Sequence, residues 1–193
     1  MFLAAVSLVL LAGLAALCGC RNEHPEPLRT INTAYGFSIV LPPGWKTFEE
    51  TTRDCMACLG AENGHGGLVY VCVRHRPPQF ATSQDDFLNR EQIKSYVEKT
   101  LLGRNVECRQ TSIQGRRAYE TLYLRTVEGP NGGVRVQFVN QTFLIRGNLL
   151  YALTTYAMGD TEAEAHARFD SFSEAALRSV MTFFLHDLPA PRH

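Results

Sequence analysis

The chain has 193 residues, of which 45% are hydrophobic and 20% are charged. These values exclude a disordered chain and a polytopic membrane protein, and the length suits one domain with a sizeable core. Lysine plus arginine and aspartate plus glutamate both number 19, so the formal net charge is zero. Because a neutral chain lacks the positive field that collects phosphate backbones, nucleic-acid binding is disfavoured.

The first 20 residues have the pattern of a bacterial lipoprotein signal. Residues 2–17 are almost wholly apolar, a run too short for a comfortable membrane span. The run closes with Leu17-Cys18-Gly19-Cys20 and then turns polar. This resembles a lipobox, in which an aliphatic residue and two small residues precede the acylated cysteine. The pattern predicts lipidation at Cys20, and the alternative is a cleaved signal peptide in which Cys20 is a plain cysteine.

The next stretch leads into an opening strand. Residues 21–34 are polar, contain two prolines and are typical of a tether. Residues 35–45 spell Tyr-Gly-Phe-Ser-Ile-Val-Leu-Pro-Pro-Gly-Trp. Their alternation predicts a strand at about 35–41, which Pro42-Pro43-Gly44 ends. Trp45, directly after it, is expected in the core.

Two segments with different patterns follow. Residues 46–67 show no periodicity and are expected to form a long irregular excursion. Residues 68–73 are apolar at every position and predict a strand buried on both faces.

The second half of the chain predicts a helix, four strands and a final helix. The capping signature Ser83-Gln84-Asp85-Asp86 is expected to open a helix that ends near Gly103. Turn residues then separate strands at about 106–113, 117–127, 134–145 and 149–157.

The final helix has its own signals. Thr161-Glu162-Ala163-Glu164 has the form of a capping box, so a helix is expected from there to about 184. Its apolar stripe includes Phe169 and Phe172. Residues 186–193 are expected to be a frayed tail.

The element order β-β-α-β-β-β-β-α predicts an α+β fold over residues 35–185, with an antiparallel sheet of about six strands packed against two amphipathic helices. The stretch 35–45 resembles the opening strand of the PsbP/Mog-like superfamily, whose members begin with such a strand running into Pro-x-Gly-Trp. The element order is similar too, over about residues 33–184. The family includes a photosystem oxygen-evolving subunit, a Ran-binding protein and many bacterial envelope lipoproteins. The resemblance therefore implies a binding platform, and it supplies no shared catalytic residues.

Four cysteines remain if Cys20 is acylated, namely Cys55, Cys58, Cys72 and Cys108. In an exported chain they favour disulfides. One bridge is expected within the CxxC of Cys55 and Cys58, and the other between Cys72 and Cys108. A link from Cys55 or Cys58 to Cys72 is the main alternative. Two other interpretations remain open: a redox pair of Cys55 and Cys58, and a zinc site made by Cys55, Cys58, Cys72 and His65.

Polar and aromatic residues alternate with apolar ones along two of the meander strands. Tyrosine and arginine are enriched at protein interfaces, so this face is a candidate binding surface. The alternative is an ordinary solvated sheet face. The candidate residues are Tyr119, Tyr123, Arg125, Arg135 and Gln137.

The sequence contains no nucleophile elbow, no HExxH and no phosphate loop. We therefore expect a non-enzymatic protein of the bacterial cell envelope, facing the periplasm and held to the membrane by its lipid anchor, that binds a protein or small ligand and carries no cofactor. Arginine rather than aspartate follows Cys20, which favours the outer membrane if the sorting rule of enteric bacteria applies. The alternatives are a thiol-disulfide or metal-binding envelope protein that uses Cys55 and Cys58, and a hydrolase with a site assembled from dispersed residues.

Overall fold

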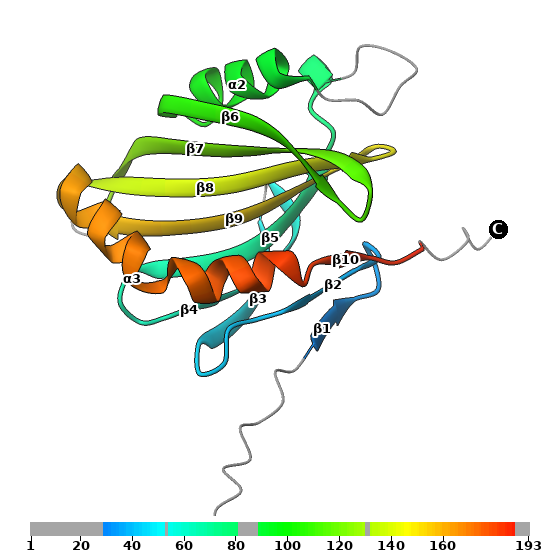
Figure 1. Cartoon of the computed structure of the whole chain (residues 1–193), viewed down its shortest axis with the longest axis horizontal. Coiled ribbons are helices and arrows are strands. Elements are labelled where there is room, and N and C mark those ends of the chain that lie inside the picture. The colour runs from blue at the N-terminus through cyan, green and yellow to red at the C-terminus, as the bar shows by residue number, and fades with distance from the viewer. Residues whose placement is uncertain (1–28, 53, 81–88, 130–131, 188–193) are drawn as a thin grey trace, which may run out of the picture.

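A computed structural model describes residues 29–52, 54–80, 89–129 and 132–187 (Figure 1). The expected signal, its Cys20, most of the tether and the end of the tail lie outside these residues. Within the described part of the chain, no helix is long and apolar enough to cross a membrane.

A seven-stranded antiparallel sheet forms the body of the fold, with strand order β3-β4-β5-β9-β8-β7-β6. A small second sheet has the order β1-β2-β10. The strands of the large sheet are β3 (Lys46–Thr52), β4 (Cys55–Glu62), β5 (Gly67–His75), β6 (Arg104–Ile113), β7 (Arg116–Glu128), β8 (Val134–Arg146) and β9 (Leu149–Gly159). Those of the small sheet are β1 (Arg29–Asn32), β2 (Phe37–Val40) and β10 (Phe184–Leu185). The α+β prediction is confirmed, although the described strands number ten rather than about six.

Among the described residues, the helices are a single 3-10 turn η1 (Pro78–Phe80), α2 (Arg90–Lys99) and α3 (Glu162–Met181). Asn89 caps α2 through a capping box with Gln92, and the expected signature at 83–86 lies outside the described residues. Thr161 caps α3 as predicted by accepting a hydrogen bond from the Glu164 N–H. The carboxylate of Glu164 accepts in turn from the Asp160 N–H, one residue earlier than a standard capping box requires.

The expectation of an irregular excursion at 46–67 is wrong, because β3 and β4 form a hairpin there. Small residues and cysteines dominate β4, so its alternation is weak in the sequence. Gly60 lies within this strand, at a position where any larger residue would place its Cβ 2.4 Å from the Cβ of Tyr70. The glycine therefore permits close packing of neighbouring strands rather than marking a loop.

Both predicted boundaries of the domain also shift outward. Residues 29–32 belong to β1, which pairs with β2, so the domain begins inside the expected tether. At the other end, the N–H of His186 donates to the Gly36 carbonyl at 2.8 Å. Short edge strands of this kind are specified by their partners, which a sequence pattern does not reveal.

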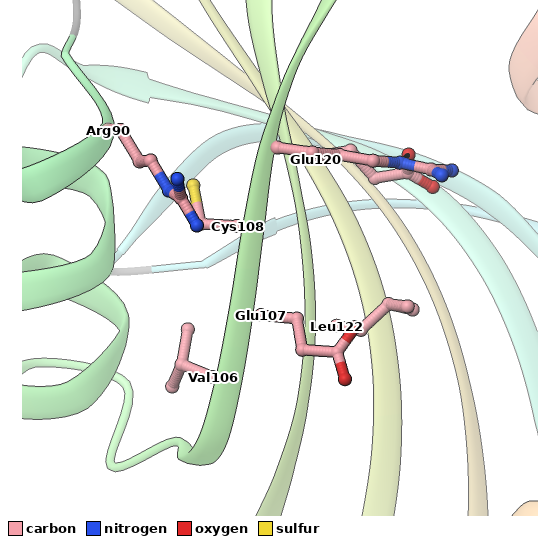
Figure 2. A pocket seen from close by; sticks show the side chains of 7 residues that line it. Arg90, Val106, Glu107, Cys108, Glu120 and Leu122 are labelled. Atoms are coloured by element: carbon pink, nitrogen blue, oxygen red, sulfur yellow. Dashed lines mark hydrogen bonds and ion pairs between the residues drawn. The ribbon is translucent and has the colours of Figure 1, made fainter.

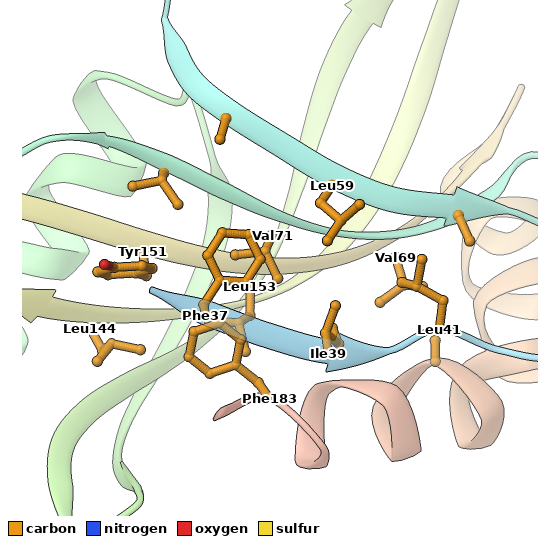
Figure 3. Packing of buried hydrophobic residues seen from close by; sticks show 14 of the residues in the cluster. Phe37, Ile39, Leu41, Leu59, Val69, Val71, Leu144, Tyr151, Leu153 and Phe183 are labelled. Carbon is orange, nitrogen blue, oxygen red and sulfur yellow. The ribbon is translucent and has the colours of Figure 1, made fainter. Parts of the chain in front are cut away.

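Each face of the large sheet carries one part of the core. On the first face, which we call the α3 face, α3 packs over β9, β8, β5 and β2. Figure 3 shows Phe37 of β2 between Leu153 of the sheet and Phe183 after α3, with Ile39 further along the same strand. The second face, which we call the α2 face, packs against η1 and α2 through Phe80, Ile93, Tyr96 and Val97.

Candidate functional site

The candidate site lies on the α3 face of the large sheet. In the ladder, Glu120 of β7 lies opposite Thr142 of β8, which lies opposite the buried core residue Leu153 of β9. Directly opposite residues project from the same face of a sheet. Because α3 packs on β9, β8 and β5, it leaves the residues of β6 and β7 on this face beside it (Figure 1).

Two adjoining cavities, of about 310 Å³ and 450 Å³, lie along these two strands. They share Arg109 and Glu120, and we call them together the β6–β7 groove. Figure 2 shows Glu107, Glu120 and Leu122 on one side of β6, with Arg90 and Cys108 on the other. The first cavity is lined by Arg90, Val106, Glu107, Cys108, Arg109, Glu120 and Leu122, and the second includes Ile113, Gln114, Thr142, Leu177, Val180 and Met181.

A charged pair occupies the centre of the groove. Arg109 Nε donates to Glu120 Oε2, and Asn140 Nδ2 donates to Glu120 Oε1 at 2.8 Å. The Glu120 side chain is only 14% exposed, whereas that of Arg109 is 74% exposed. The hydrogen bond from Arg109 to Glu120 raises the pKa of the arginine, so its guanidinium stays charged. The Glu120 carboxylate is therefore held in place by Asn140 and in turn positions the exposed guanidinium of Arg109.

An apolar wall runs along the same groove. Leu177, Val180 and Met181 come from the last turns of α3, and Met181 is 85% exposed. Methionine and arginine are both enriched at the cores of protein interfaces. The groove therefore combines a positioned charge with an adaptable apolar edge, a combination suited to recognition.

The pairing of Arg109 with Glu120 could have been predicted from the sequence, because the turn between β6 and β7 sets their register. Gln114 and Gly115 both have positive φ, which a two-residue hairpin turn requires. Such a turn sets Ile113 opposite Arg116, and counting outward places Arg109 opposite Glu120. The pair is therefore predictable from the turn, although its position beside α3 is not.

The candidate surface predicted from the meander is mostly buried. Tyr119, Tyr123 and Gln137 are buried, the first two under α2. Arg125 Nε donates to Gln137 Oε1 at 2.5 Å, and Arg135 Nε donates to Asp160 Oδ1 at 3.2 Å. The expectation that these side chains form an exposed recognition face is therefore wrong for the tyrosines and for Gln137, because α2 and the neighbouring strands cover them.

The cysteines of the described chain are free thiols, and three of them lie together. Cys58 lies opposite Cys72 in the β4–β5 ladder. The Cys55 thiol donates a hydrogen bond to the Ala57 carbonyl at 2.9 Å. The neighbouring Cys58 thiol and burial raise the pKa of Cys55 to about 11. The Cys55 thiol and burial likewise raise the pKa of Cys72.

The predicted Cys72–Cys108 bridge and the predicted zinc site are both wrong, because in each at least one residue lies apart from the rest in the fold. Cys108 is on β6, and β9, β8 and β7 lie between β6 and β5 in the sheet, so the strand adjacency needed for a Cys72–Cys108 bridge is absent. His65 lies in the turn between β4 and β5. Among residues 29–52, 54–80, 89–129 and 132–187, no three His, Cys, Asp or Glu side chains are arranged to hold a metal. The structure therefore does not bring together the predicted zinc ligands.

No family model and no curated protein matches this sequence. Solved structures do match. CyanoP, the cyanobacterial PsbP of Synechocystis sp. PCC 6803, has a TM-score of 0.54 and 12% identity, covering 88% of this chain and 99% of its own. The Ran-binding protein Mog1p of Saccharomyces cerevisiae has a TM-score of 0.51 and 14% identity, covering 84% of this chain and 97% of its own. A mutant of Mog1 gives 0.52 and 14%, with 83% and 96% covered.

Identities this low establish a likeness of fold alone. The matches extend over nearly the whole length of the compared proteins. They also include both kinds of protein that the opening motif and element order resemble. The chain therefore has the fold shared by PsbP and Mog1p, which confirms the PsbP/Mog-like resemblance at the level of the fold.

Proposed function

We propose that this protein is a non-enzymatic module of the bacterial cell envelope, anchored by a lipid at Cys20, that binds a protein partner through the β6–β7 groove. The observation that carries the proposal is the exposed Arg109 guanidinium, held by the nearly buried Glu120 beside the exposed Met181. Mog1p is described as a Ran-binding protein, so one protein of this fold binds a protein partner.

The segment between Cys20 and β1 limits how far the domain can lie from the membrane. The first strand begins at Arg29, so residues 21–28 separate it from Cys20. A chain of that length spans at most about 28 Å. The domain is therefore proposed to stay close to the periplasmic surface of a membrane, with the outer membrane favoured by Arg21 after Cys20. In that oxidising space we also propose that the domain carries a disulfide.

The anchoring part of the proposal is tested by replacing Cys20. Cys20→Ala is expected to leave the membrane fraction or to remain unprocessed, since stable attachment needs the acyl chains that this cysteine would carry. The matched control is Cys18→Ala, which is expected to remain anchored. An unmodified Cys20 in the intact mass of membrane-purified protein would contradict lipidation.

The binding part is tested by affinity capture from detergent-solubilised envelope, with the full chain as bait. Arg109→Ala and Met181→Asp are each expected to reduce recovery of the specific partner at least tenfold, because they remove the charge and the apolar edge of the groove. The matched control is Arg178→Ala, since Arg178 is also exposed but pairs with Glu174 along α3. Equal recovery with all three variants would place binding elsewhere and overturn the proposal.

A thiol-disulfide protein using Cys55 and Cys58 is the second candidate, favoured by the thiol cluster. Catalytic thiols of that class work as thiolates with lowered pKa. The raised pKa of Cys55 and Cys72 keeps these thiols protonated at neutral pH. The cluster therefore supports an internal bridge more strongly than an oxidoreductase.

A further inference from the structure

The register of β4 and β5 places the Cα atoms of two cysteines within the range that a disulfide spans. Cys58 and Cys72 are Cα partners in the antiparallel ladder. Such partners are about 4.5–5.5 Å apart, inside the range of about 4.4–6.8 Å that disulfides span. Their side chains project from the same face, so this pair needs no change in strand register to form a bond.

The CxxC pair is placed differently. Cys55 and Cys58 both belong to β4 and are three positions apart in an extended strand. The strand is irregular between them, because Glu50 and Thr52 of β3 lie opposite Cys58 and Cys55, so two positions of β3 face three of β4. The β4–β5 ladder begins only at Ala57, so no strand register sets Cys55 and Cys58 opposite one another. The Cys55 and Cys72 thiols nevertheless lie close enough across the two strands for each to perturb the pKa of the other. Both cross-strand pairings share Cys72.

Access to the cluster is uneven. Cys55 and Cys72 are only 6% and 3% exposed, whereas Cys58 is half-buried. Arg74 Nη2 donates to Cys72 Sγ at 3.4 Å, and Arg74 Nη1 donates to the Tyr96 hydroxyl at 2.9 Å. An external reagent therefore reaches Cys58 first, while Cys72 is shielded and contacts the Arg74 guanidinium.

We propose that Cys72 is the common member of a cross-strand disulfide site, that Cys58 is the thiol through which oxidation enters, and that Cys55 can take the place of Cys58 by exchange. In the cell, the inference rests on the proposed export, because an oxidising compartment must supply the oxidant. The oxidant is a small-molecule disulfide, RSSR.

The reaction balances in two steps. The Cys58 thiolate attacks one sulfur of RSSR, the S–S bond breaks, and one RS⁻ leaves and takes up a proton. The Cys72 thiolate then attacks the Cys58 sulfur and expels the second RS⁻. Two protein thiols have lost two electrons and two protons, and two RSH have formed. Attack of Cys55 on the Cys72 sulfur releases Cys58 as a thiol and moves the bridge to the two most buried cysteines, with no net redox change.

The test uses the full chain in detergent, reduced, freed of reductant and exposed to oxidised glutathione at pH 8. Each cysteine is then assigned by non-reducing peptide mapping. We expect every internal bridge within the described domain to contain Cys72, with Cys108 left as a thiol or as a glutathione adduct. Cys58→Ser is expected to slow bridge formation at least tenfold and to yield Cys55–Cys72. Cys55→Ser is expected to form Cys58–Cys72 at the wild-type rate.

Cys108→Ser is the matched control and should change neither rate nor product. Circular dichroism of every variant checks that it is folded, and the wild-type map is decisive even if one variant is not. A predominant Cys55–Cys58 bridge, a Cys72 that stays free, or an unchanged rate in Cys58→Ser would overturn the inference. Because Arg109 and Glu120 lie on the α3 face whereas Cys58 and Cys72 lie on the α2 face, such a result would leave partner capture through Arg109 unaffected.

Discussion

At the scale of single residues, the α2 face holds a chain of satisfied polar groups. The Tyr123 hydroxyl donates to Gln141 Oε1 at 3.0 Å, and Gln141 Nε2 donates to Thr154 Oγ1 at 2.7 Å. Burial raises the pKa of Tyr123 to about 12. Buried polar groups that are fully paired specify one packing arrangement, whereas an unpaired one is costly. These residues therefore serve the interior of the fold, and the proposed recognition role belongs to Arg109 on the opposite face.

The raised pKa of Cys55 predicts a loss of stability at alkaline pH. In the unfolded chain this thiol titrates near 9, whereas in the folded protein it titrates near 11. The folded state therefore keeps its proton through a pH range in which the unfolded state has released it. By linkage, the stabilisation is complete below pH 9 and is lost as pH rises towards 11.

Urea midpoints measured with reductant from pH 8 to pH 11 check this expectation. Cys55→Ser removes the titrating group, so its midpoint should fall less steeply over that range than that of the wild type. Parallel decline of the two proteins would contradict the proposed environment of the thiol. Cys108→Ser serves as a comparison on another strand.

At the scale of elements, α3 is held to the sheet by a cluster of aromatic rings. Phe172 packs edge-on against Trp45 with ring centroids 5.5 Å apart, and its centroid lies 5.7 Å from that of Phe169. A Cβ on Gly67 would lie 2.5 Å from the Phe172 ring, so the glycine lets the helix approach β5. Trp45 is half-buried rather than fully buried, so it covers this cluster from its edge.

We expect Phe172→Ala to lower the free energy of unfolding by about 3–5 kcal/mol, because it leaves a cavity beneath α3. Trp45→Ala is expected to cost less, since part of its ring already contacts solvent. Gly67→Ala is expected to cost about 1–3 kcal/mol through overpacking. Urea denaturation measures all three, with the exposed Ala175→Ser on the outer side of α3 as the control. A Phe172→Ala protein as stable as the control would mean that the docking of α3 is misassigned.

At the scale of the whole molecule, the small sheet joins the two ends of the domain. β2 pairs with β1 on one side and with β10 on the other. Around this junction, the Val40 N–H donates to Thr182 Oγ1 at 2.8 Å, and the Tyr151 hydroxyl donates to the Tyr35 carbonyl at 2.7 Å. The His186 ring lies 2.8 Å from Ser38 Oγ. The beginning and end of the described domain are therefore interdependent.

A chain that ends after Phe183 loses β10, the buried Leu185 and the contacts of His186. We expect this truncation to cost about 2–4 kcal/mol, from one buried leucine and a few hydrogen bonds. The matched control ends after Asp187 and keeps every contact described above. Thermal or urea unfolding distinguishes the two, and equal stability would show that β10 contributes nothing to the closure of the domain.

The sequence by itself determined the elements from β5 to α3 and the turns between the meander strands, but not the β3–β4 hairpin or the short strands β1 and β10. The four meander strands from β6 to β9 follow from alternation between glycine- and asparagine-containing turns, because these signals act between near neighbours in the chain. The same holds for the cap at Thr161, and for the turn at Gln114 and Gly115 that sets Arg109 opposite Glu120. The opening strand with its Pro-Pro-Gly end, together with the order of the elements, indicated the fold.

Only the tertiary structure decided what each face does. Alternation along β7 assigns Tyr119 and Tyr123 to one face, but their burial depends on α2, whose position is set by contacts far apart in sequence. The β4–β5 hairpin sets Cys58 opposite Cys72, whereas the sheet order inserts β9, β8 and β7 between β5 and β6 and so keeps Cys108 away from both. A local pattern states which residues share a face. Long-range packing determines which face is covered, and therefore which side chains remain available for binding.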